Sequence, residues 1–408
     1  MKPVSNLALI GPLVCGLFVS NLATAGFPNP FQLSLETATA SFPVGSQSKL
    51  NLGFKVNSQS NSLLDMIDAT KSTLDIEIYE MSSVTVRNAV YAAQKRGVSV
   101  RIIYEPKPVG SSCDIVGGVS GAVQSKDPNC MATVSFLKQV EKNGGQTVPF
   151  NKKLCGTATT SCFQHGKIVI SDKKVALVST GNFNSSNLCL SLEKPSKCNR
   201  DYSVVVDDSE ILAGLQSFFD QDFAAAPFDP KSLLTPKLAQ KMTVSPISKQ
   251  ALIDMIQSAK TSVEVQNQYL RDPDLNQALI DVATRGVKVQ LMVVSACNFG
   301  KPTAKDTQQF NSIYGAFAQA GIDARFFTKK IQVNGYPGYM HAKAIVVDGK
   351  YGWVGSINGS TTSLDSNREY GVFFDEATWV QSLQGQMASD FTHQMSANLQ
   401  ESLTCVKD

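Results

Sequence analysis

The sequence predicts an α/β fold that is built twice, in two similar halves of one chain. The chain has 408 residues, of which 43% are hydrophobic and 17% charged, and this length exceeds what one ordinary core holds. Helical and β-branched patterns alternate in the same order in both halves. The composition excludes a disordered or coiled-coil protein, and a mean hydropathy of −0.06 excludes a polytopic membrane protein.

The amino terminus has the three parts of a secretory signal. Lys2 provides a charged start, an apolar stretch runs from Leu7 to Val19, and Ala23-Thr24-Ala25 forms a small-residue cleavage site. The alternative is an uncleaved anchor, but the apolar stretch is shorter than the roughly 20 residues that a bilayer span needs. We therefore expect residues 1–25 to be a signal peptide and the protein to be exported, either secreted or periplasmic, with no integral span after cleavage.

The net charge limits the possible partners, and the cysteine count fits an exported protein. Lys and Arg number 37 and Asp and Glu 34, for a net charge of +3, which argues against a surface that binds nucleic acid throughout. After loss of Cys15, eight cysteines remain, an even number that favours disulfides over metal ligation in an oxidising compartment. Closeness in sequence predicts the pairs Cys113–Cys130, Cys155–Cys162 and Cys189–Cys198, which leaves Cys297 for Cys405.

An internal repeat gives the order of the elements. "DMIDATKSTLDIEIYE" from Asp65 resembles "DMIQSAKTSVEVQNQY" from Asp254, and "KRGVSVRII" resembles "TRGVKVQLM". Each copy predicts a helix, an extended stretch (74–79 and 263–269), a second helix that ends at a glycine, and a strand. Later, "QHGKIVISD" matches "MHAKAIVVD", "GNFN" matches "GSIN", and "NRDYSVVVD" matches "NREYGVFFD", before a closing helix in each copy.

The domain limits follow from this repeat. The offset between copies falls from 189 at Asp65 to 168 at Asp201, so the first copy carries insertions, and these coincide with the cysteines. Prolines between the copies predict a linker. We expect a first half at 26–225 with disulfide-rich insertions, a linker at 226–247, and a second half at 248–408.

Two of the three histidines stand at equivalent places in the two copies. His165 is followed by Lys167 and Asp172, and His341 by Lys343 and Asp348, with the same spacing. The apolar run after each lysine predicts a buried strand, whose period of two places His and Lys on one face. A buried ammonium needs an anion. If the two copies face one another, both pairs converge on a pocket that fits a phosphodiester, joined by the amides of Asn184 and Asn358 in the "GNFN" and "GSIN" turns.

Two imidazoles allow a division of chemical labour. One attacks phosphorus to form a phosphohistidine, and the other protonates the departing alkoxide and then takes a proton from water or an alcohol. The lysines and asparagines hold the non-bridging oxygens, and we expect no metal or other cofactor. Asp201 and Glu369 are candidates to orient the imidazoles, either within their own copy or across to the other, although both could instead pair with the neighbouring Arg200 and Arg368.

The paired HxKxxxxD motifs and the GxxN turns that follow them resemble those of the phospholipase D superfamily over roughly residues 60–400. The resemblance implies two α/β/α sandwich halves related by a pseudo-twofold axis that share one active site. It implies that His165 is the nucleophile and His341 the acid and base, and that Asp172 and Asp348 support the strands. Asn182 departs from the Ser or Gly that the family most often has there, and the second copy has Ser356.

The resemblance leads to the expectation of an exported phospholipase D that hydrolyses, or transfers, the head group of glycerophospholipids such as phosphatidylcholine to give phosphatidic acid. A secreted nuclease is the alternative, and cardiolipin synthase-like phosphatidyl transfer is a second alternative. A non-catalytic envelope protein that kept the fold is disfavoured by the intact motifs. We expect a monomer whose partner is a phospholipid at a membrane surface, with nucleic acid a less favoured partner.

Overall fold

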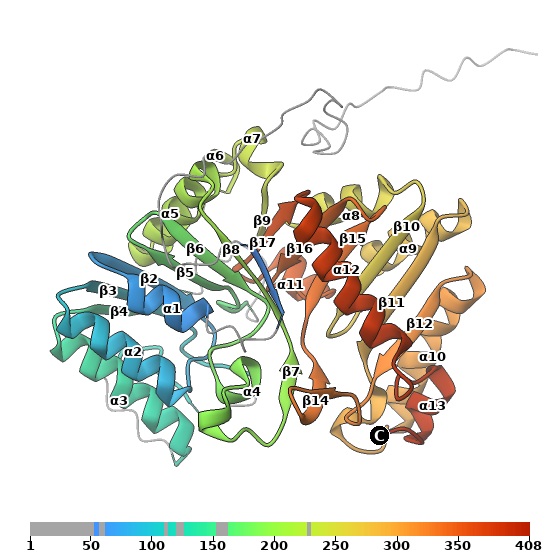
Figure 1. Cartoon of the computed structure of the whole chain (residues 1–408), viewed down its shortest axis with the longest axis horizontal. Helices are drawn as coiled ribbons and strands as arrows, with labels where there is room; N and C mark the ends of the chain where they lie inside the picture. The colour runs from blue at the N-terminus through green and yellow to red at the C-terminus, as the bar shows by residue number, and fades with distance from the viewer. Residues whose placement is uncertain (1–52, 57–61, 110–112, 120–125, 152–161, 227–229) are drawn as a thin grey trace, which may run out of the picture.

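The computed structural model of the protein describes residues 53–56, 62–109, 113–119, 126–151, 162–226 and 230–408. The predicted signal peptide and Cys155 lie outside these residues. Two α/β halves lie side by side, each with a seven-stranded mixed sheet that carries helices (Figure 1). The α/β class and the duplication that the sequence predicts are therefore confirmed.

The first sheet has the strand order β1-β8-β6-β5-β2-β3-β4. Strands β2, β3 and β4 are parallel, whereas β5, β6, β8 and β1 run antiparallel to their neighbours. The strands are β1 (Gly53–Val56), β2 (Thr73–Ile78), β3 (Ser99–Tyr104), β4 (Gln146–Pro149), β5 (Lys167–Ser171), β6 (Val175–Ser179) and β8 (Tyr202–Val206). The helices of this half are α1 (Ser62–Ala69), α2 (Val84–Lys95), α3 (Pro128–Lys142), α4 (Ser185–Leu188) and α5 (Ser209–Phe223), with a 3-10 turn η2 (Ser191–Glu193).

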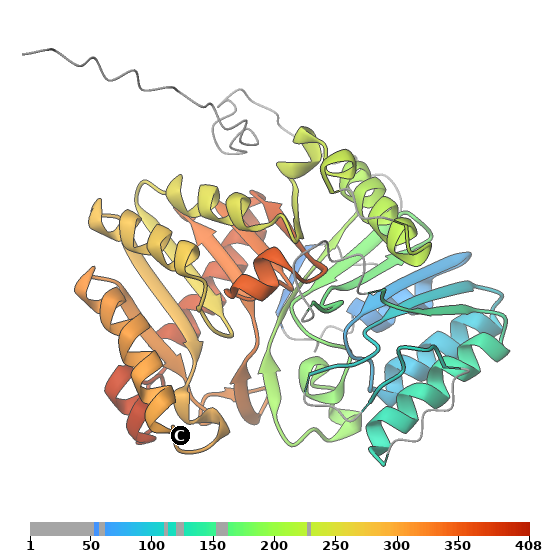
Figure 2. The same cartoon turned by 180° about the vertical axis from the view of Figure 1, so that it is seen from behind.

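The second sheet repeats this arrangement with the order β12-β11-β10-β15-β16-β17-β9 in reverse. Its strands are β9 (Met242–Ser245), β10 (Ser262–Asn267), β11 (Lys288–Val294), β12 (Asp323–Phe327), β15 (Lys343–Val347), β16 (Tyr351–Gly355) and β17 (Glu369–Phe374). Its helices are α8 (Lys249–Gln257), α9 (Pro273–Thr284), α10 (Ala304–Gln319), α11 (Thr361–Asp365), α12 (Ala377–Thr392) and α13 (Leu399–Thr404), with a 3-10 turn η3 (Ala296–Phe299). Helices α8–α10 and helix α12 cover opposite faces of this sheet (Figures 1 and 2).

The repeat begins earlier in the second half than the sequence predicts. Strand β9 is the edge strand that corresponds to β1, and it pairs antiparallel with β17. Two short helices, α6 (Pro230–Leu233) and α7 (Pro236–Ala239), precede it within the segment assigned to a linker. Pro236 begins α7 instead of interrupting a helix, because the first turn of a helix does not need the backbone N–H that proline lacks.

The inner faces of the two sheets share one hydrophobic core. This cluster includes α5 residues such as Phe218 and Phe219 and α12 residues such as Leu383, together with inward residues of both sheets. Two separate clusters lie under α1–α3 and under α8–α10. Each sheet is thus covered on both faces, as in an α/β/α sandwich, and the two halves pack through a continuous core.

A small sheet joins the halves at the ends of their histidine-bearing segments. Strand β7 (Cys198–Arg200) of the first half pairs in parallel with β14 (Tyr336–Met340) of the second, and β14 also pairs with β13 (Gln332–Val333). A single bridge between Gln164 and Arg368 is the pseudo-symmetric counterpart. The backbone before each histidine is therefore fixed by the opposite half.

Three of the four predicted disulfides are present, namely Cys113–Cys130, Cys189–Cys198 and Cys297–Cys405. The fourth prediction involves Cys155, outside the described residues. None of the described helices combines the length and apolar character required to cross a bilayer.

Candidate active site

Each motif histidine is held by the opposite half of the molecule. His165 donates its backbone N–H to the Arg368 carbonyl at 2.9 Å, and its Nδ1 lies 2.8 Å from Glu369 Oε2. His341 donates its N–H to the Arg200 carbonyl at 3.1 Å, and its Nδ1 lies 2.9 Å from Asp201 Oδ1. The open question of whether the carboxylates serve their own copy is thereby answered, because both reach across.

The arginines beside these carboxylates also reach across, but to other partners. Arg200 forms a bidentate ion pair with Asp390 on α12, and Arg368 forms one with Asp222 on α5. All four side chains are buried. Asp201 is thus left to orient its histidine, and the same holds for Glu369, instead of either pairing with the adjacent arginine.

The motif lysines are fully buried beside the histidines. Lys167 Nζ donates to the His165 carbonyl and Lys343 Nζ to the His341 carbonyl, each at 2.5 Å. Lys343 Nζ also lies 3.3 Å from the Thr180 carbonyl of the opposite half. Burial lowers the pKa of Lys343 to about 8 and that of Lys167 well below its ordinary value, against the opposing effect of the two carboxylates.

The electrostatic environment favours neutral imidazoles in the unliganded protein. Burial lowers the pKa of His165 to about 4, and the charge of Lys167 adds to this effect while Glu369 opposes it. Burial and Lys343 lower the pKa of His341 to about 4 in the same way. Each histidine also responds to the lysine of the other half, so the four groups lie within electrostatic reach of one another.

The carboxylates keep their charge despite complete burial. The pKa of Asp201 is lowered because His341, Lys343 and the Thr180 hydroxyl outweigh the opposing effect of burial. The pKa of Glu369 is lowered in the same way, chiefly by its histidine. Nδ1 of each imidazole is bound to a carboxylate, which leaves Nε2 as the ring nitrogen that can face a substrate. In His341, Lys343 Nζ lies 3.3 Å from both ring nitrogens.

The two turn asparagines have different surroundings. Asn184 caps α4, where its Oδ1 accepts from Asn187 N–H at 2.9 Å, and its Nδ2 lies 3.2 Å from Glu80 Oε2. Asn358 is buried, and its Oδ1 has no hydrogen-bond partner among the described residues. Their predicted contacts with phosphate stay predictions.

The motif aspartates lie away from the histidines, at the far end of the strands. Asp172 accepts the backbone N–H groups of residues 71–73, and Asp348 accepts those of residues 260–262, at distances of 2.7–3.1 Å. Both have a positive φ, 52° and 53°. Each thus closes the turn that leads into the neighbouring strand, β2 or β10, which fits a supporting role.

A cavity of about 220 Å³ in the first half is linked to His165 through Tyr79. Tyr79 lines it, and the same ring lies edge-on to His165 with 4.9 Å between centroids. Apolar side chains such as Phe136 and the disulfide cysteines 113 and 130 form much of the wall, and Glu80 and Glu105 contribute carboxylates. Part of the first-copy insertion therefore shapes the space beside the site.

Sequence reasoning missed Asn187 and Thr180. Asn187 Nδ2 lies 2.7 Å from Asp201 Oδ2 and 3.2 Å from His341 Nδ1, and Thr180 donates its hydroxyl to Asp201 Oδ1 at 2.7 Å. The "GNFNSSN" segment offered no signal for Asn187, because the corresponding residue of the second copy is Thr361. On the other side, Asn367 Nδ2 donates to Glu369 Oε1 at 2.9 Å, so the two carboxylates are supported differently.

Curated relatives match this chain over part of their length. A cardiolipin synthase from Listeria welshimeri is 27% identical over 276 residues, which is 63% of this chain and 54% of the relative. A probable cardiolipin synthase from Bacillus subtilis is 26% identical over 272 residues, 62% of this chain and 51% of the relative. The match therefore spans about half the length of these relatives.

Solved structures share the fold at low sequence identity. A phosphatidylserine synthase from Haemophilus influenzae superposes with a TM-score of 0.56 and 12% identity over 87% of this chain and 92% of its own. A polyphosphate kinase from Porphyromonas gingivalis superposes with a TM-score of 0.54 and 12% identity over 85% of this chain and 53% of its own.

The family model described as "Cardiolipin synthase, PLD-like domain" matches residues 63–223 and 252–391, which are the two halves described above. Both matched segments contain one of the histidine–lysine motifs. The chain therefore belongs to the phospholipase D superfamily.

Proposed function

We propose that this protein transfers the phosphatidyl group of one phospholipid to the hydroxyl of another, in cardiolipin synthase-like chemistry with a phosphohistidine intermediate. The observation that carries the proposal is the crossed arrangement of His165 with Glu369 and His341 with Asp201. It holds Nδ1 of both rings and leaves Nε2 of each for the reacting phosphodiester.

The first step breaks the bond between phosphorus and the leaving alcohol. Nε2 of neutral His165 attacks phosphorus, and a P–N bond forms as the P–O bond breaks. His341, in its protonated form, gives its proton to the departing alkoxide, which leaves as a neutral alcohol. His341 is then neutral and His165 carries the phosphatidyl group.

The second step runs in the opposite sense: a P–O bond forms, the P–N bond breaks, and His341 accepts a proton. The incoming alcohol gives its proton to Nε2 of His341 while its oxygen attacks phosphorus, and the P–N bond breaks. His165 returns to its neutral state and His341 to its protonated state, so no net proton is gained or lost. Water in place of the alcohol gives hydrolysis by the same route.

The buried lysines make the site ready for an anion. Lys167 and Lys343 are two basic side chains with no exposed surface, whose charged form burial disfavours, and Asp201 and Glu369 already pair with the histidines. A phosphodiester brings a negative charge that stabilises both ammonium groups and raises the pKa of His341 toward the range in which it acts as an acid. Substrate binding thus supplies the proton-donating form that the free site disfavours.

The choice of transfer over hydrolysis draws on the relatives, whose printed names are cardiolipin synthases. The expected hydrolysis of phosphatidylcholine gains no support from them, and phosphatidyl transfer, the second alternative from sequence, is the better supported. We extend the proposal to an exported enzyme that acts at a membrane surface, on the strength of the amino-terminal pattern and the disulfides.

The proposal is tested by offering the purified protein vesicles of phosphatidylglycerol, vesicles of phosphatidylcholine, and duplex DNA, followed by mass spectrometry of the products. We expect cardiolipin and glycerol from the first and loss of both products in His165→Ala and His341→Ala. His393→Ala is the control, because His393 follows α12 and its imidazole Nδ1 accepts from the nearby Met395 N–H. Phosphatidic acid without cardiolipin, or cleaved DNA, would overturn the transfer reaction.

A leaving group that needs no acid separates the two histidines. With the p-nitrophenyl ester of phosphatidic acid, His341→Ala is expected to release one equivalent of nitrophenol in a burst and to carry a phosphatidyl adduct on His165. The acid is dispensable for so good a leaving group, but the base that activates the acceptor is missing. His165→Ala should show neither burst nor adduct, and an adduct on His341 would reverse the assignment.

A further inference from the structure

Two exposed apolar side chains stand at the tips of short 3-10 turns, one from each half. Leu192 lies in η2 and is 85% exposed, and Phe299 ends η3 and is 79% exposed. No other large hydrophobic side chain in the described part of the chain is as exposed as these two. Single exposed apolar residues are common, so their meaning depends on what surrounds them.

The two segments that carry these tips both contact Tyr339, which lies beside the active site. The Phe299 ring packs edge-on against Tyr339 with 5.7 Å between centroids, and Lys197 Nζ lies 4.9 Å from the centroid of the Tyr339 ring on the side of the η2 loop. Tyr339 in turn lies 6.3 Å from the His341 ring, centroid to centroid. The loop of the first half and the turn of the second thus meet beside the catalytic histidine.

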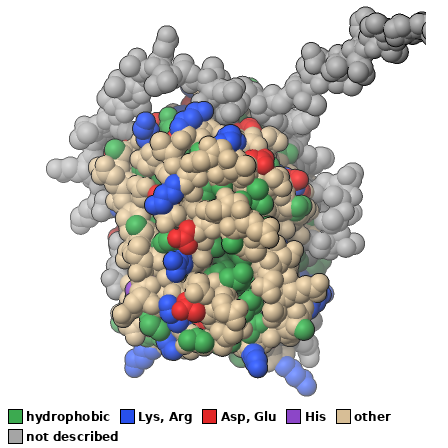
Figure 3. Space-filling view, turned by 90° about the vertical axis from the view of Figure 1, so that its right-hand side faces the viewer, with side chains coloured by type: hydrophobic (Ala, Val, Ile, Leu, Met, Phe, Trp, Pro, Cys, Tyr) green, Lys and Arg blue, Asp and Glu red, His purple; other side chains and the backbone are tan. Residues whose placement is uncertain are grey.

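The charges around these tips are mostly positive. Lys194, Lys197 and Lys301 are exposed on the same two segments as Leu192 and Phe299. The acidic residue within the loop, Glu193, is bound through Oε1 to Ser83 Oγ and Thr85 N–H. On the face that Figure 3 shows, Lys and Arg side chains project from the lower edge, the edge at which β14 and the C-terminus lie in Figure 1.

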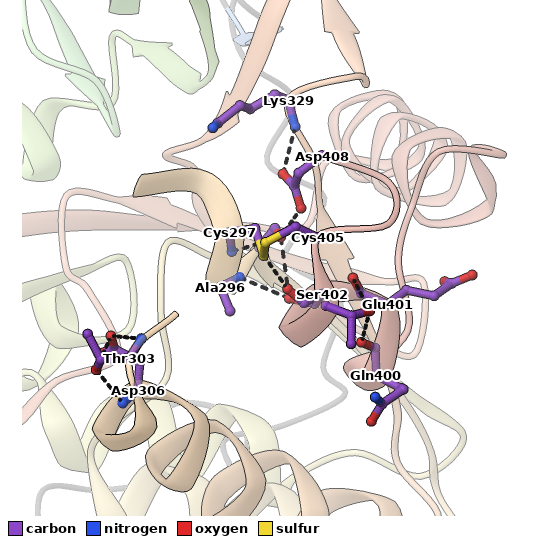
Figure 4. The surroundings of a disulfide bond; sticks show 12 residues. Ala296, Cys297, Thr303, Asp306, Lys329, Gln400, Glu401, Ser402, Cys405 and Asp408 are labelled. Atoms are coloured by element: carbon purple, nitrogen blue, oxygen red, sulfur yellow. Dashed lines mark hydrogen bonds between the residues drawn. A yellow bond between two sulfur atoms is a disulfide. The ribbon is translucent and has the colours of Figure 1, made fainter. Parts of the chain in front are cut away.

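Disulfides hold both tips in place. Cys189–Cys198 closes the loop that carries Leu192, and Cys297 within η3 is bonded to Cys405 after α13. Figure 4 shows the second anchor, where Ala296 N–H also donates to Ser402 Oγ at 2.9 Å. A rigid apolar tip loses little conformational entropy when it enters an apolar phase, so its burial is more favourable than that of a mobile loop.

We propose that Leu192, Lys194, Lys197, Phe299 and Lys301 form a docking rim that seats the active site on the surface of an anionic phospholipid membrane. The inference rests on the proposed phosphatidyl transfer and adds where the enzyme meets its lipid. The two apolar tips enter the region between head groups and acyl chains, the lysines contact head-group phosphates, and Tyr339 lies between the rim and His341.

The test measures binding separately from turnover. The full chain with His165→Ala is mixed with large vesicles of phosphatidylcholine that contain 30 mol% phosphatidylglycerol, and the bound fraction is measured by flotation. We expect Leu192→Asp and Phe299→Asp each to weaken binding at least tenfold, and Lys197→Gln to weaken it about fivefold at low salt only. Phe299→Trp should bind as tightly as the parent or more tightly, because Trp favours the membrane interface.

Tyr351→Asp is the matched control. Tyr351 is an exposed aromatic residue at the start of β16, paired with Val347 at the end of the sheet away from Lys343. We expect this variant to bind vesicles like the parent. Equal loss in Tyr351→Asp, or unchanged binding in both Leu192→Asp and Phe299→Asp, would overturn the docking rim.

Activity measurements distinguish this inference from the function on which it rests. In the active enzyme, we expect the ratio of turnover on vesicles to turnover on monomeric short-chain phosphatidylglycerol to fall about tenfold in Leu192→Asp. Rim-dependent vesicle binding without lipid transfer would overturn the proposed function and support the rim. Transfer that does not depend on the rim would overturn the rim alone, and binding of DNA in place of vesicles would overturn both.

Discussion

His165→Gln is expected to change how the free energy of unfolding depends on pH. Burial lowers the pKa of His165 to about 4, whereas an exposed histidine in the unfolded chain titrates near 6.5. Between these values the unfolded chain binds a proton that the folded protein does not, so stability is lost as the pH falls through this range. Relative to pH 7.5, one such residue lowers the free energy of unfolding at pH 5 by about 2 kcal/mol.

Glutamine removes the titration and keeps an N–H that can donate to Glu369. Urea unfolding of the disulfide-bonded protein, followed by tryptophan fluorescence, gives the free energy of unfolding at both pH values. The quantity to compare is the free energy of unfolding of the variant minus that of the parent. We expect this difference to be about 2 kcal/mol larger at pH 5 than at pH 7.5. His393→Gln controls for the loss of a histidine elsewhere.

If the free energies of unfolding of variant and parent differ by the same amount at both pH values, the conclusion that His165 is neutral and buried is refuted. A change of equal size in the His393 variant would do the same. Since the neutral form is the one that attacks phosphorus, such a result would also contradict the neutral nucleophile that the proposed first step requires.

Three further substitutions probe the interface between the halves. Asp201→Asn should lower kcat at least about 100-fold with little change in KM, because an amide cannot stabilise the protonated ring; a change in KM alone would contradict this. Burial, and next Asp222, raise the pKa of Glu77 to about 8, so the parent loses stability as the pH rises from 5 to 8 and Glu77→Gln should gain stability relative to it. A difference in urea midpoint between variant and parent that is the same at both pH values would disprove this. Asp222→Asn should lower the free energy of unfolding by about 3–5 kcal/mol, because the buried Arg368 guanidinium loses its carboxylate partner. The exposed Asp323→Asn should lower it by less than about 1 kcal/mol, and urea unfolding measures both.

Much of the fold was accessible from sequence because each half repeats the same local patterns. Helix α2 ends beside Gly97, whose φ of 90° suits glycine, and Gly286 does the same for α9 with a φ of 88°. The buried strands β5 and β15 follow their lysines as the apolar runs predict. A duplicated signal is more specific than a single one, because chance resemblance rarely occurs twice in the same order.

The remaining features depend on contacts between distant segments. Strand β9 has four residues and lies in a proline-rich stretch, so only its pairing with β17 makes it a strand. No local pattern tells whether Asp201 serves its own half or the other. Asn187 is recognised only when the halves are brought together, since its amide reaches His341 across the interface.

Because each histidine is oriented by a carboxylate of the other half, the active site needs both halves of the molecule. A single copy of one half would contain a histidine–lysine strand but, as a monomer, not the acid that orients its ring. The first copy carries the longer loops, and the one closed by Cys189–Cys198 reaches Tyr339 of the second half through Lys197. The two copies thus differ in their loops but keep the same arrangement of histidine, lysine and carboxylate at the active site.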